Sequence, residues 1–296
     1  MTKKILLILT LSLIASNLFG RTIRVATYNL SNYLVADRII NGRYTKMYPK
    51  PESEKEAIHK IITTIQPDIL IVQEMGEEPF LKELQTDLKN LKLYYPYTHL
   101  AKGSDDVRHI AVLSKEPFAN ATSYNELNYK FFKNNKMPVK RGLLELQFKT
   151  EDTEWSIFCV HLKSRRWNKP QDYESLKQRI GEATAIRDKI KERCPHPEKS
   201  NYLILGDFND NPKSKTIKRF LKSGKQMLSI ILPAKDSRKE VWTHFRESYG
   251  VYSQIDYILV SPPFLEKIKA KSASIADPPF TLDASDHRMV YADIVF

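Results

Sequence analysis

Cysteine is scarce in this chain. Only Cys159 and Cys194 occur among the 296 residues, so at most one internal disulfide can form. Cys159 lies in an apolar, strand-like run, where a buried free thiol is the alternative interpretation. Internal repeats and low-complexity linkers are also missing. Their absence favours one domain, spanning residues 21–296, over two.

The apolar stretch near the amino terminus is too short to span a membrane comfortably. Residues 5–14 are almost wholly apolar, follow Lys3 and Lys4, and precede small or polar residues up to Gly20. This order is typical of a secretory signal. We therefore predict a signal peptide over residues 1–20, export to the periplasm or out of the cell, and no stable membrane span after cleavage. An uncleaved anchor is the alternative, and the absence of cysteine here gives no support for lipid attachment.

Acidic residues are outnumbered by basic ones. The chain has 47 Lys and Arg against 35 Asp and Glu, which gives a formal net charge of +12, or +10 once Lys3 and Lys4 are removed with the signal. This balance favours a polyanionic partner such as nucleic acid or an acidic membrane surface, although it is also common without one. The composition is otherwise globular, with 42% hydrophobic residues to build a core.

Strand-like and helix-like patterns alternate along the chain, which indicates an α/β or α+β fold with mixed sheets. A loop rich in Tyr, Asn, Arg and Lys is expected up to residue 50, and Ser53 with Glu56 resembles a capping box at the start of the first helix. Strands are predicted at residues 23–28, 68–73, 109–113, 143–148, 155–160, 202–205, 254–260 and 289–295, and helices at residues 53–66, 80–91, 173–191 and 217–221.

Four of the predicted strands end at a polar residue, namely Asn29, Glu74, His161 and Asp207. Polar residues at several strand ends are what a shared cleft would contain. After the apolar strand at 202–205, Gly206 lets the backbone turn, and residues 207 and 209 project the same way if the chain stays extended. A carboxylate and an amide that face one point suit activation of a water beside a phosphate. A strand end with an Asx-rich turn is the structural alternative.

Six short motifs occur in an order that resembles the endonuclease/exonuclease/phosphatase superfamily, which includes deoxyribonuclease I and the apurinic endonucleases. They are Thr27-Tyr28-Asn29, Val72-Gln73-Glu74, His161-Leu162-Lys163-Ser164, Gly206-Asp207-Phe208-Asn209, Ile255-Asp256-Tyr257 and Ser285-Asp286-His287. Each motif alone is weak, whereas six in order form a strong signal. Apurinic endonucleases carry an acid where this chain has Ser31, so the resemblance is closer to the deoxyribonuclease branch.

The resemblance implies a four-layer αββα sandwich, in which two packed mixed β-sheets are flanked by helices, as in deoxyribonuclease I. It implies hydrolysis of a phosphate ester with a divalent metal, usually Mg²⁺, with Mn²⁺ and Ca²⁺ as alternatives. We expect the protein to be a monomer.

The resemblance also implies a role for each site residue. Metal binding falls to Glu74, with Asn29 and Asp286 in support. Asp207 is expected to activate the attacking water, and His287, oriented by Asp256, is expected to stabilise the transition state. His161 is a candidate to protonate the leaving oxygen, while Asn29 and Asn209 are expected to hold the phosphate.

Basic and aromatic residues near these motifs favour a nucleic acid substrate. Lys163 and Arg166 follow His161 and are predicted to bind substrate phosphate, and Trp167 to stack on a base or sugar. Arg108 and His109 are further candidates for substrate contact. An exported endonuclease that cleaves DNA, or RNA, is the leading hypothesis. The alternatives are a sphingomyelinase-type lipid phosphodiesterase, which residues 129–132 would dock on a membrane, a small-molecule phosphatase, and a non-catalytic binding protein.

Overall fold

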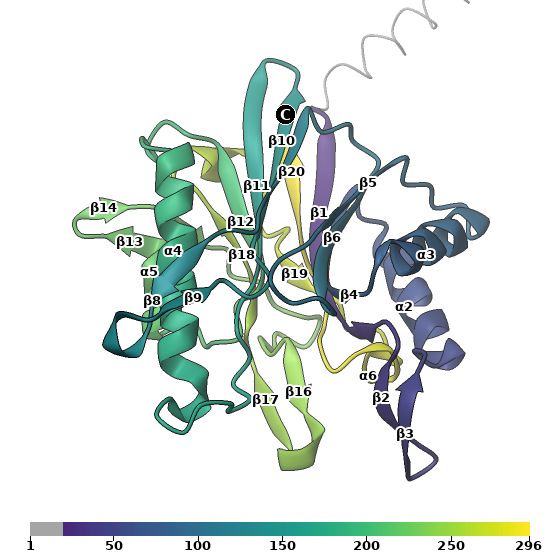
Figure 1. Ribbon diagram of the computed structural model, residues 1–296. Helices are drawn as coiled ribbons and strands as arrows, with labels where there is room; N and C mark the ends of the chain where they lie inside the picture. The colour runs from purple at the N-terminus through teal and green to yellow at the C-terminus, as the bar shows by residue number, and fades with distance from the viewer. Residues whose placement is uncertain (1–19) are drawn as a thin grey trace, which may run out of the picture.

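Two six-stranded sheets pack face to face at the centre of the molecule, and helices cover the outer face of each (Figure 1). The computed structural model describes residues 20–296, so the predicted signal peptide lies almost wholly outside the described residues. The arrangement confirms the predicted four-layer αββα sandwich. Within residues 20–296, no helix is long and apolar enough to cross a membrane.

The first sheet carries the amino-terminal half of the site. Strands β1 and β4 run parallel at its centre, and its other neighbouring strands pair antiparallel, so the sheet is mixed. In spatial order its strands are β19 (Ser274–Ile275), β20 (Val290–Val295), β1 (Thr22–Tyr33), β4 (Ile69–Met75), β6 (His109–Ser114) and β5 (Tyr97–Ala101).

The second sheet has a similar plan. Strands β11 and β12 run parallel at its centre, and antiparallel strands flank them on both sides. In spatial order its strands are β15 (Ile230–Ile231), β18 (Asp256–Val260), β12 (Tyr202–Asp207), β11 (Thr153–His161), β10 (Leu143–Thr150) and β7 (Asn120–Tyr124).

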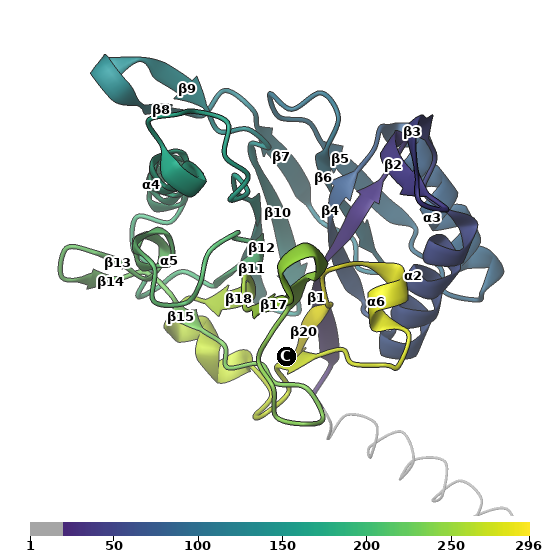
Figure 2. The same ribbon diagram turned by 90° about the horizontal axis from the view of Figure 1, so that it is seen from below.

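Each sheet buries both faces, one against the other sheet and one against helices (Figure 2). This explains why the central strands are nearly continuous apolar runs. Between the sheets, Trp155 stacks on Phe148 with ring centres 4.6 Å apart. The helices are α2 (Glu52–Ile65) and α3 (Glu78–Asn90) on the first sheet, α4 (Leu176–Arg193) and α5 (Lys215–Leu221) on the second, and the short α6 (Thr281–Ala284) beside α2.

Four two-stranded hairpins project from the sandwich. They are β2 (Ala36–Ile40) with β3 (Arg43–Tyr48), β8 (Asn128–Lys130) with β9 (Lys136–Pro138), β13 (Lys222–Ser223) with β14 (Gln226–Met227), and β16 (His244–Arg246) with β17 (Val251–Ser253). The first hairpin corrects the predicted loop up to residue 50. Its strands are exposed or half-buried along their length, so no buried face left an apolar alternation to be read in the sequence.

The four main helices begin one to three residues away from their predicted starts, and α2 and α4 show why. Helix α2 begins at Glu52 after Pro51, without a side-chain cap, so Ser53 lies in the first turn rather than at the cap. Helix α4 begins at Leu176, after the 3₁₀ turn Tyr173–Ser175. Local polar patterns mark a helix start only approximately, because the chain that leads into the helix decides which residue takes the cap position.

Both cysteines are free thiols. Cys159 is buried in β11, as the sequence indicated, and Cys194 is half-buried at the end of α4. Burial raises the pKa of the Cys159 thiol well above its ordinary value, so this group is an inert part of the core rather than a nucleophile.

Gly206 provides a test of the fold at the end of β12. Its φ is +142°, and a Cβ there would lie 1.9 Å from the carbonyl oxygen of Val160. We expect Gly206→Ala to lower the free energy of unfolding by about 2–4 kcal/mol, measured by urea denaturation. Gly224→Ala is the matched control, because Gly224 also has a positive φ but open space around it, and should cost about 1 kcal/mol. Equal losses in the two variants would contradict the steric argument.

Candidate active site

Four strand ends from two different sheets meet at one edge of the sandwich. Asn29 and Glu74 lie on β1 and β4 of the first sheet, and His161 and Asp207 end β11 and β12 of the second. The Asn29 side-chain amide donates to Asp207 Oδ2 at 3.1 Å and so joins the sheets. His161 Nε2 lies 3.6 Å from Asp207 Oδ2 and 3.9 Å from Glu74 Oε1. The structure therefore places these four predicted site residues together.

His287 and Asp256 complete the cluster on the far side of Asp207. Asp256 pairs with Asp207 across the β12–β18 ladder. His287 Nδ1 lies 3.0 Å from Asp256 Oδ2, and its other ring nitrogen, Nε2, lies 4.0 Å from Asp207 Oδ2. The Ser285 hydroxyl accepts from the His287 backbone N–H and donates to the Asn29 carbonyl oxygen, which fixes the loop to β1.

Asp207 is a buried carboxylate that titrates near neutral pH. Burial is the main reason that its pKa rises to about 7, and the neighbouring charge of Asp256 adds to the rise. His287, together with amide donors from Asn209 and Asn29, acts in the opposite direction. Because a general base works best when its pKa is close to the ambient pH, this environment suits Asp207 for taking a proton from water.

The two histidines of the cluster carry opposite protonation states. Burial disfavours a charged His287, but the carboxylates of Asp256 and Asp207 outweigh this and raise its pKa well above the ordinary value. Burial and the nearby Arg141 lower the pKa of His161 far below the ordinary value. His287 is thus an imidazolium at neutral pH and His161 a neutral ring. This disfavours the expected role of His161 as proton donor to the leaving oxygen, because a neutral histidine is a weak acid.

Several site residues have backbone conformations that are unusual for non-glycine residues. Glu74, Asn209, Ser31 and Asn32 all have positive φ, between 48° and 61°. The register of β1 against β4 shifts between Asn29 and the end of the strand. Side-chain oxygens hold these turns, since Glu74 Oε2 accepts from the Asn32 N–H at 3.0 Å and Asn29 Oδ1 from the Ser31 N–H. Strain of this kind concentrates at functional sites.

Glu74 has the properties of a ligand for a divalent metal. Its carboxylate is partly exposed and lines a cavity, with His161 Nε2 3.9 Å from Oε1 and Arg108 Nε 3.8 Å from Oε2. Mg²⁺ usually takes one or two protein carboxylates and fills its other positions with water and phosphate. The Glu74 carboxylate therefore fits a divalent ion, whereas the Asn29 side-chain oxygen accepts from the Ser31 N–H, and its predicted part in metal binding stays a prediction.

Asp286 does not share an acidic cluster with Glu74. Among the described residues, the groups of three or more metal-ligating side chains are Asp207–Asp256–His287 and His244–Asp286–His287, and Glu74 belongs to neither. Asp286 Oδ2 lies 3.7 Å from His244 Nε2, its side chain is half exposed, and the neighbouring His244 and His287 hold its pKa below the ordinary value. Its predicted part in metal binding stays a prediction, and its observed partner is a histidine.

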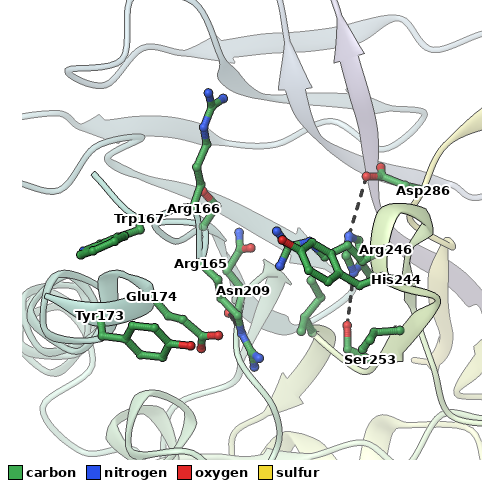
Figure 3. Close-up of a pocket in the computed structure, with 14 residues that line it drawn as sticks. Arg165, Arg166, Trp167, Tyr173, Glu174, Asn209, His244, Arg246, Ser253 and Asp286 are labelled. Atoms are coloured by element: carbon green, nitrogen blue, oxygen red, sulfur yellow. Dashed lines mark hydrogen bonds and ion pairs between the residues drawn. The ribbon is translucent and has the colours of Figure 1, made fainter. Parts of the chain in front are cut away.

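His244 is a site residue that sequence reasoning missed. It begins β16, its ring centre lies 4.6 Å from that of His287, and its Nδ1 lies 3.2 Å from the Ser253 hydroxyl (Figure 3). Only its neighbours in space connect it to the site, because Thr243-His244-Phe245 carries no recognised motif. His109 lies near Glu77, 3.4 Å from its carboxylate.

A cleft of about 770 Å³ opens beside the acid–histidine cluster. One wall carries Trp167 and Tyr173, which are 58% and 77% exposed, and the facing hairpin carries Arg246 and Tyr249, the latter 68% exposed (Figure 3). The full lining is Ser164, Arg165, Arg166, Trp167, Tyr173, Glu174, Asn209, His244, Arg246, Tyr249, Val251, Ser253, Ile255 and Asp286. The cleft thus combines arginines with exposed aromatic rings, and we call it the aromatic cleft.

The two predicted phosphate-binding residues after His161 differ in their surroundings. The Lys163 ammonium donates to the carbonyl oxygens of Ser164 and Arg166, at 3.0 and 2.9 Å, and so braces its own loop. Burial, with Arg141 nearby, lowers the pKa of Lys163 to about 8. Arg166 lines the cleft, and its guanidinium extends away from Trp167 (Figure 3).

Helix α4 anchors the loops on both sides of the site. The buried Glu182 carboxylate accepts from the backbone N–H groups of Lys140 and Lys163, at 3.0 and 2.6 Å. One turn earlier, Arg179 donates to Asp210 Oδ2 and to the carbonyl oxygen of residue 163. The β9–β10 connection and the loop after β11 are therefore fixed to the same helix.

The two-sheet sandwich carries acids and histidines together at its strand ends, an arrangement suited to hydrolysis of phosphate esters. The comparisons with known proteins agree. The model of the Endonuclease/Exonuclease/phosphatase family matches residues 26–287. The chain belongs to this family, whose members are phosphoric ester hydrolases that generally use divalent metals. No curated protein sequence matches the chain significantly.

Solved structures support the same fold at low sequence identity. The human nocturnin catalytic domain has a TM-score of 0.62 and 19% identity, and the match covers 93% of this chain and 94% of that one. A mannosyl-6-phosphatase from Bacteroides thetaiotaomicron has a TM-score of 0.60, 19% identity, and coverage of 93% and 100%. An AP endonuclease from Archaeoglobus fulgidus has a TM-score of 0.61 and 15% identity, and the match covers 91% of this chain and 98% of that one. Proteins with such different activities share this fold, so the substrate depends on the residues of the site rather than on the fold.

The cluster predicts which substitutions abolish hydrolysis of phosphate esters. Asp207→Ala and His287→Ala should each lower kcat by at least about 100-fold, because the first removes the base and the second removes a fixed positive charge. The measurement is hydrolysis of bis(p-nitrophenyl) phosphate in Mg²⁺ or Mn²⁺. Full activity in both variants would refute the site assignment.

The pKa shifts predict the pH dependence of kcat/KM. Asp207 must be ionised, so activity should fall as the pH drops below about 7. His287 must be protonated, and because its pKa is raised, the alkaline limb should lie well above pH 6.5. Asp256→Asn removes the carboxylate that raises the His287 pKa and should move the alkaline limb to lower pH. If the alkaline limb does not move in this variant, deprotonation of His287 is not what causes the loss of activity at high pH.

Proposed function

We propose that the protein is an exported, divalent-metal-dependent phosphodiesterase that cleaves nucleic acid internally, with DNA ahead of RNA as substrate. The observation that carries the proposal is the buried Asp207–His287–Asp256 cluster beside a cleft lined by arginines and exposed aromatic side chains, which Asn209, His244 and Asp286 connect to the cluster. The cluster supports the chemistry, and the cleft supports the choice of substrate.

The chemistry follows from the protonation states. Asp207 accepts a proton from the attacking water, and the imidazolium of His287, held by Asp256, stabilises the negative charge that develops on the phosphoryl group. The amides of Asn29 and Asn209 hold Asp207 in place. A divalent ion at Glu74 would supply Lewis-acid polarisation of the phosphoryl oxygen when bound. His161 is neutral and offers a hydrogen bond rather than a proton.

The cleft favours a polymer with bases and phosphates. Aromatic side chains stack on bases with little regard to sequence, and arginines contact phosphates. Trp167, Tyr173 and Tyr249 expose large rings to the cleft, and Arg165 and Arg246 lie among them. A small phosphomonoester would use little of this surface.

A lipid phosphodiesterase of the sphingomyelinase type is the second candidate. The structure favours a membrane-docking segment other than the predicted residues 129–132. Residues 129–132 are unsuitable, because Tyr129 is buried with its ring against Gly181 of α4. The β16–β17 hairpin instead exposes Tyr249, Val251 and Tyr252 next to the site. An apolar hairpin of this kind can insert at a membrane interface.

Export is a part of the proposal that rests on sequence alone. Lys3 and Lys4, followed by the apolar residues 5–14, have the order of a secretory signal. A secreted or periplasmic enzyme of this class would meet nucleic acid outside the cytoplasm.

A panel of substrates tests this proposal. Plasmid DNA, RNA and sphingomyelin liposomes are incubated with the protein in Mg²⁺, Mn²⁺ or excess EDTA, and we expect DNA cleavage that EDTA abolishes. Trp167→Ala should raise KM for DNA about 10-fold, because base stacking is lost. Tyr94→Ala is the control, since that exposed ring lies outside the cleft beside Lys89. Robust lipid cleavage without nuclease activity would overturn the choice of substrate.

A further inference from the structure

A second cavity, of about 370 Å³, is lined by Glu74 and, like the first cleft, by Ser164 and Arg166. Its lining includes five cationic side chains but only one carboxylate, that of Glu74. The cations are Arg108, Lys140, Arg141, Lys163 and Arg166. We call this cavity the basic pocket. A concentration of positive charge in a concave site attracts and holds anions.

Arg141 is the most informative of these residues. It is only 6% exposed, and its Nη1 has no hydrogen-bond partner among the described residues. The Asp105 carboxylate lies beside it, with Oδ2 3.2 Å from Arg141 Nε, and the buried Glu182 carboxylate also interacts with its charge. Neither Nε nor Nη1 has a hydrogen-bond partner among the described residues, and an unpaired buried donor costs free energy. These donors are therefore available to an anion in the pocket.

Neighbouring residues show that the pocket has excess positive charge. Lys140 shares Asp105 with Arg141, at the longer distance of 3.7 Å. The Lys163 pKa is lowered to about 8 by burial and by the positive charges of Arg141 and Lys140. An anion between these groups would relieve their repulsion. Arg108 has oxygen partners, since its Nε donates to Asn32 Oδ1 at 2.8 Å, and so forms a fixed wall.

We propose that the basic pocket binds a second phosphate group of the substrate, next to the phosphate that is cleaved. Asp207 and His287 line neither cavity, and of the residues given a part in cleavage at the metal Glu74 alone lines the basic pocket. Its five cations exceed the charge of the one phosphate that is cleaved, and a second phosphate would balance them. Ser164 and Arg166 line both the basic pocket and the aromatic cleft, and one extended substrate can therefore reach both. The inference rests on the proposed phosphodiesterase function and specifies its substrate as one with a second phosphate beside the one that is cleaved.

Small substrates with and without the extra phosphate test this inference. We compare kcat/KM for bis(p-nitrophenyl) phosphate, a dinucleotide, its 5′-phosphorylated and 3′-phosphorylated forms, and a trinucleotide. One of the phosphorylated dinucleotides should exceed the plain dinucleotide by at least about tenfold, the value of a charge-assisted hydrogen bond. A similar gain for the trinucleotide assigns the pocket to a backbone phosphate, and a gain confined to the phosphomonoester assigns it to a terminal one.

The variant Lys140→Gln should reduce this ratio to near one, while Lys225→Gln, an exposed lysine at the β13–β14 turn, should leave it unchanged. Arg141→Lys is the second variant, checked for folding by thermal unfolding because the residue is buried. Equal rates for all the nucleotides, or an equal loss on bis(p-nitrophenyl) phosphate in Lys140→Gln, would overturn the inference. Absence of any hydrolysis by the unmodified protein would instead refute the proposed function.

Discussion

The hydrogen bond from Asn29 to Asp207 is the contact on which the site depends, because it connects the two sheets at their shared edge. Each sheet alone carries only half of the polar groups. Their meeting removes Asp207 from water, and this burial is the main cause of its raised pKa. The reactivity of the carboxylate is therefore a consequence of how the two sheets pack, rather than of any local sequence.

The same packing gives two histidines different chemistry. His287 is held by the carboxylate of Asp256 and is positively charged, whereas burial, with Arg141 nearby, keeps His161 neutral although Asp207 and Glu74 lie within 4 Å of it. The two rings therefore differ because His287 has a directly paired carboxylate on Nδ1 and His161 has none among the described residues. The family relationship establishes a phosphoester hydrolase, and this difference between the two histidines is what the structure of the chain adds to it.

Much of this arrangement was readable from the sequence. The central strands are apolar on both faces, so their runs were visible, and the polar residues at their ends identified Asn29, Glu74, His161 and Asp207. The β2–β3 hairpin was missed because it has no buried face, and His244 and Arg141 because no motif marks them. Their importance comes from neighbours distant in sequence, since His244 meets His287 and Arg141 meets Asp105 only in the folded chain.

The left-handed backbone at Glu74 and Asn209 was also beyond prediction, because either residue could adopt ordinary strand geometry. Hydrogen bonds from the other strand ends select the rarer conformation, and those exist only after folding. A Glu at the end of an apolar strand was a good sign of function, but the direction of its side chain depended on a turn that its own sequence does not encode.

Helix α4 has a consequence for both cavities at once. Glu182 holds the backbone of Lys140 beside the basic pocket and that of Lys163 at the boundary with the aromatic cleft, and Arg179 fixes the same boundary to Asp210. Both cavities therefore share one support, and a substitution that displaced this helix would alter the walls of both at once.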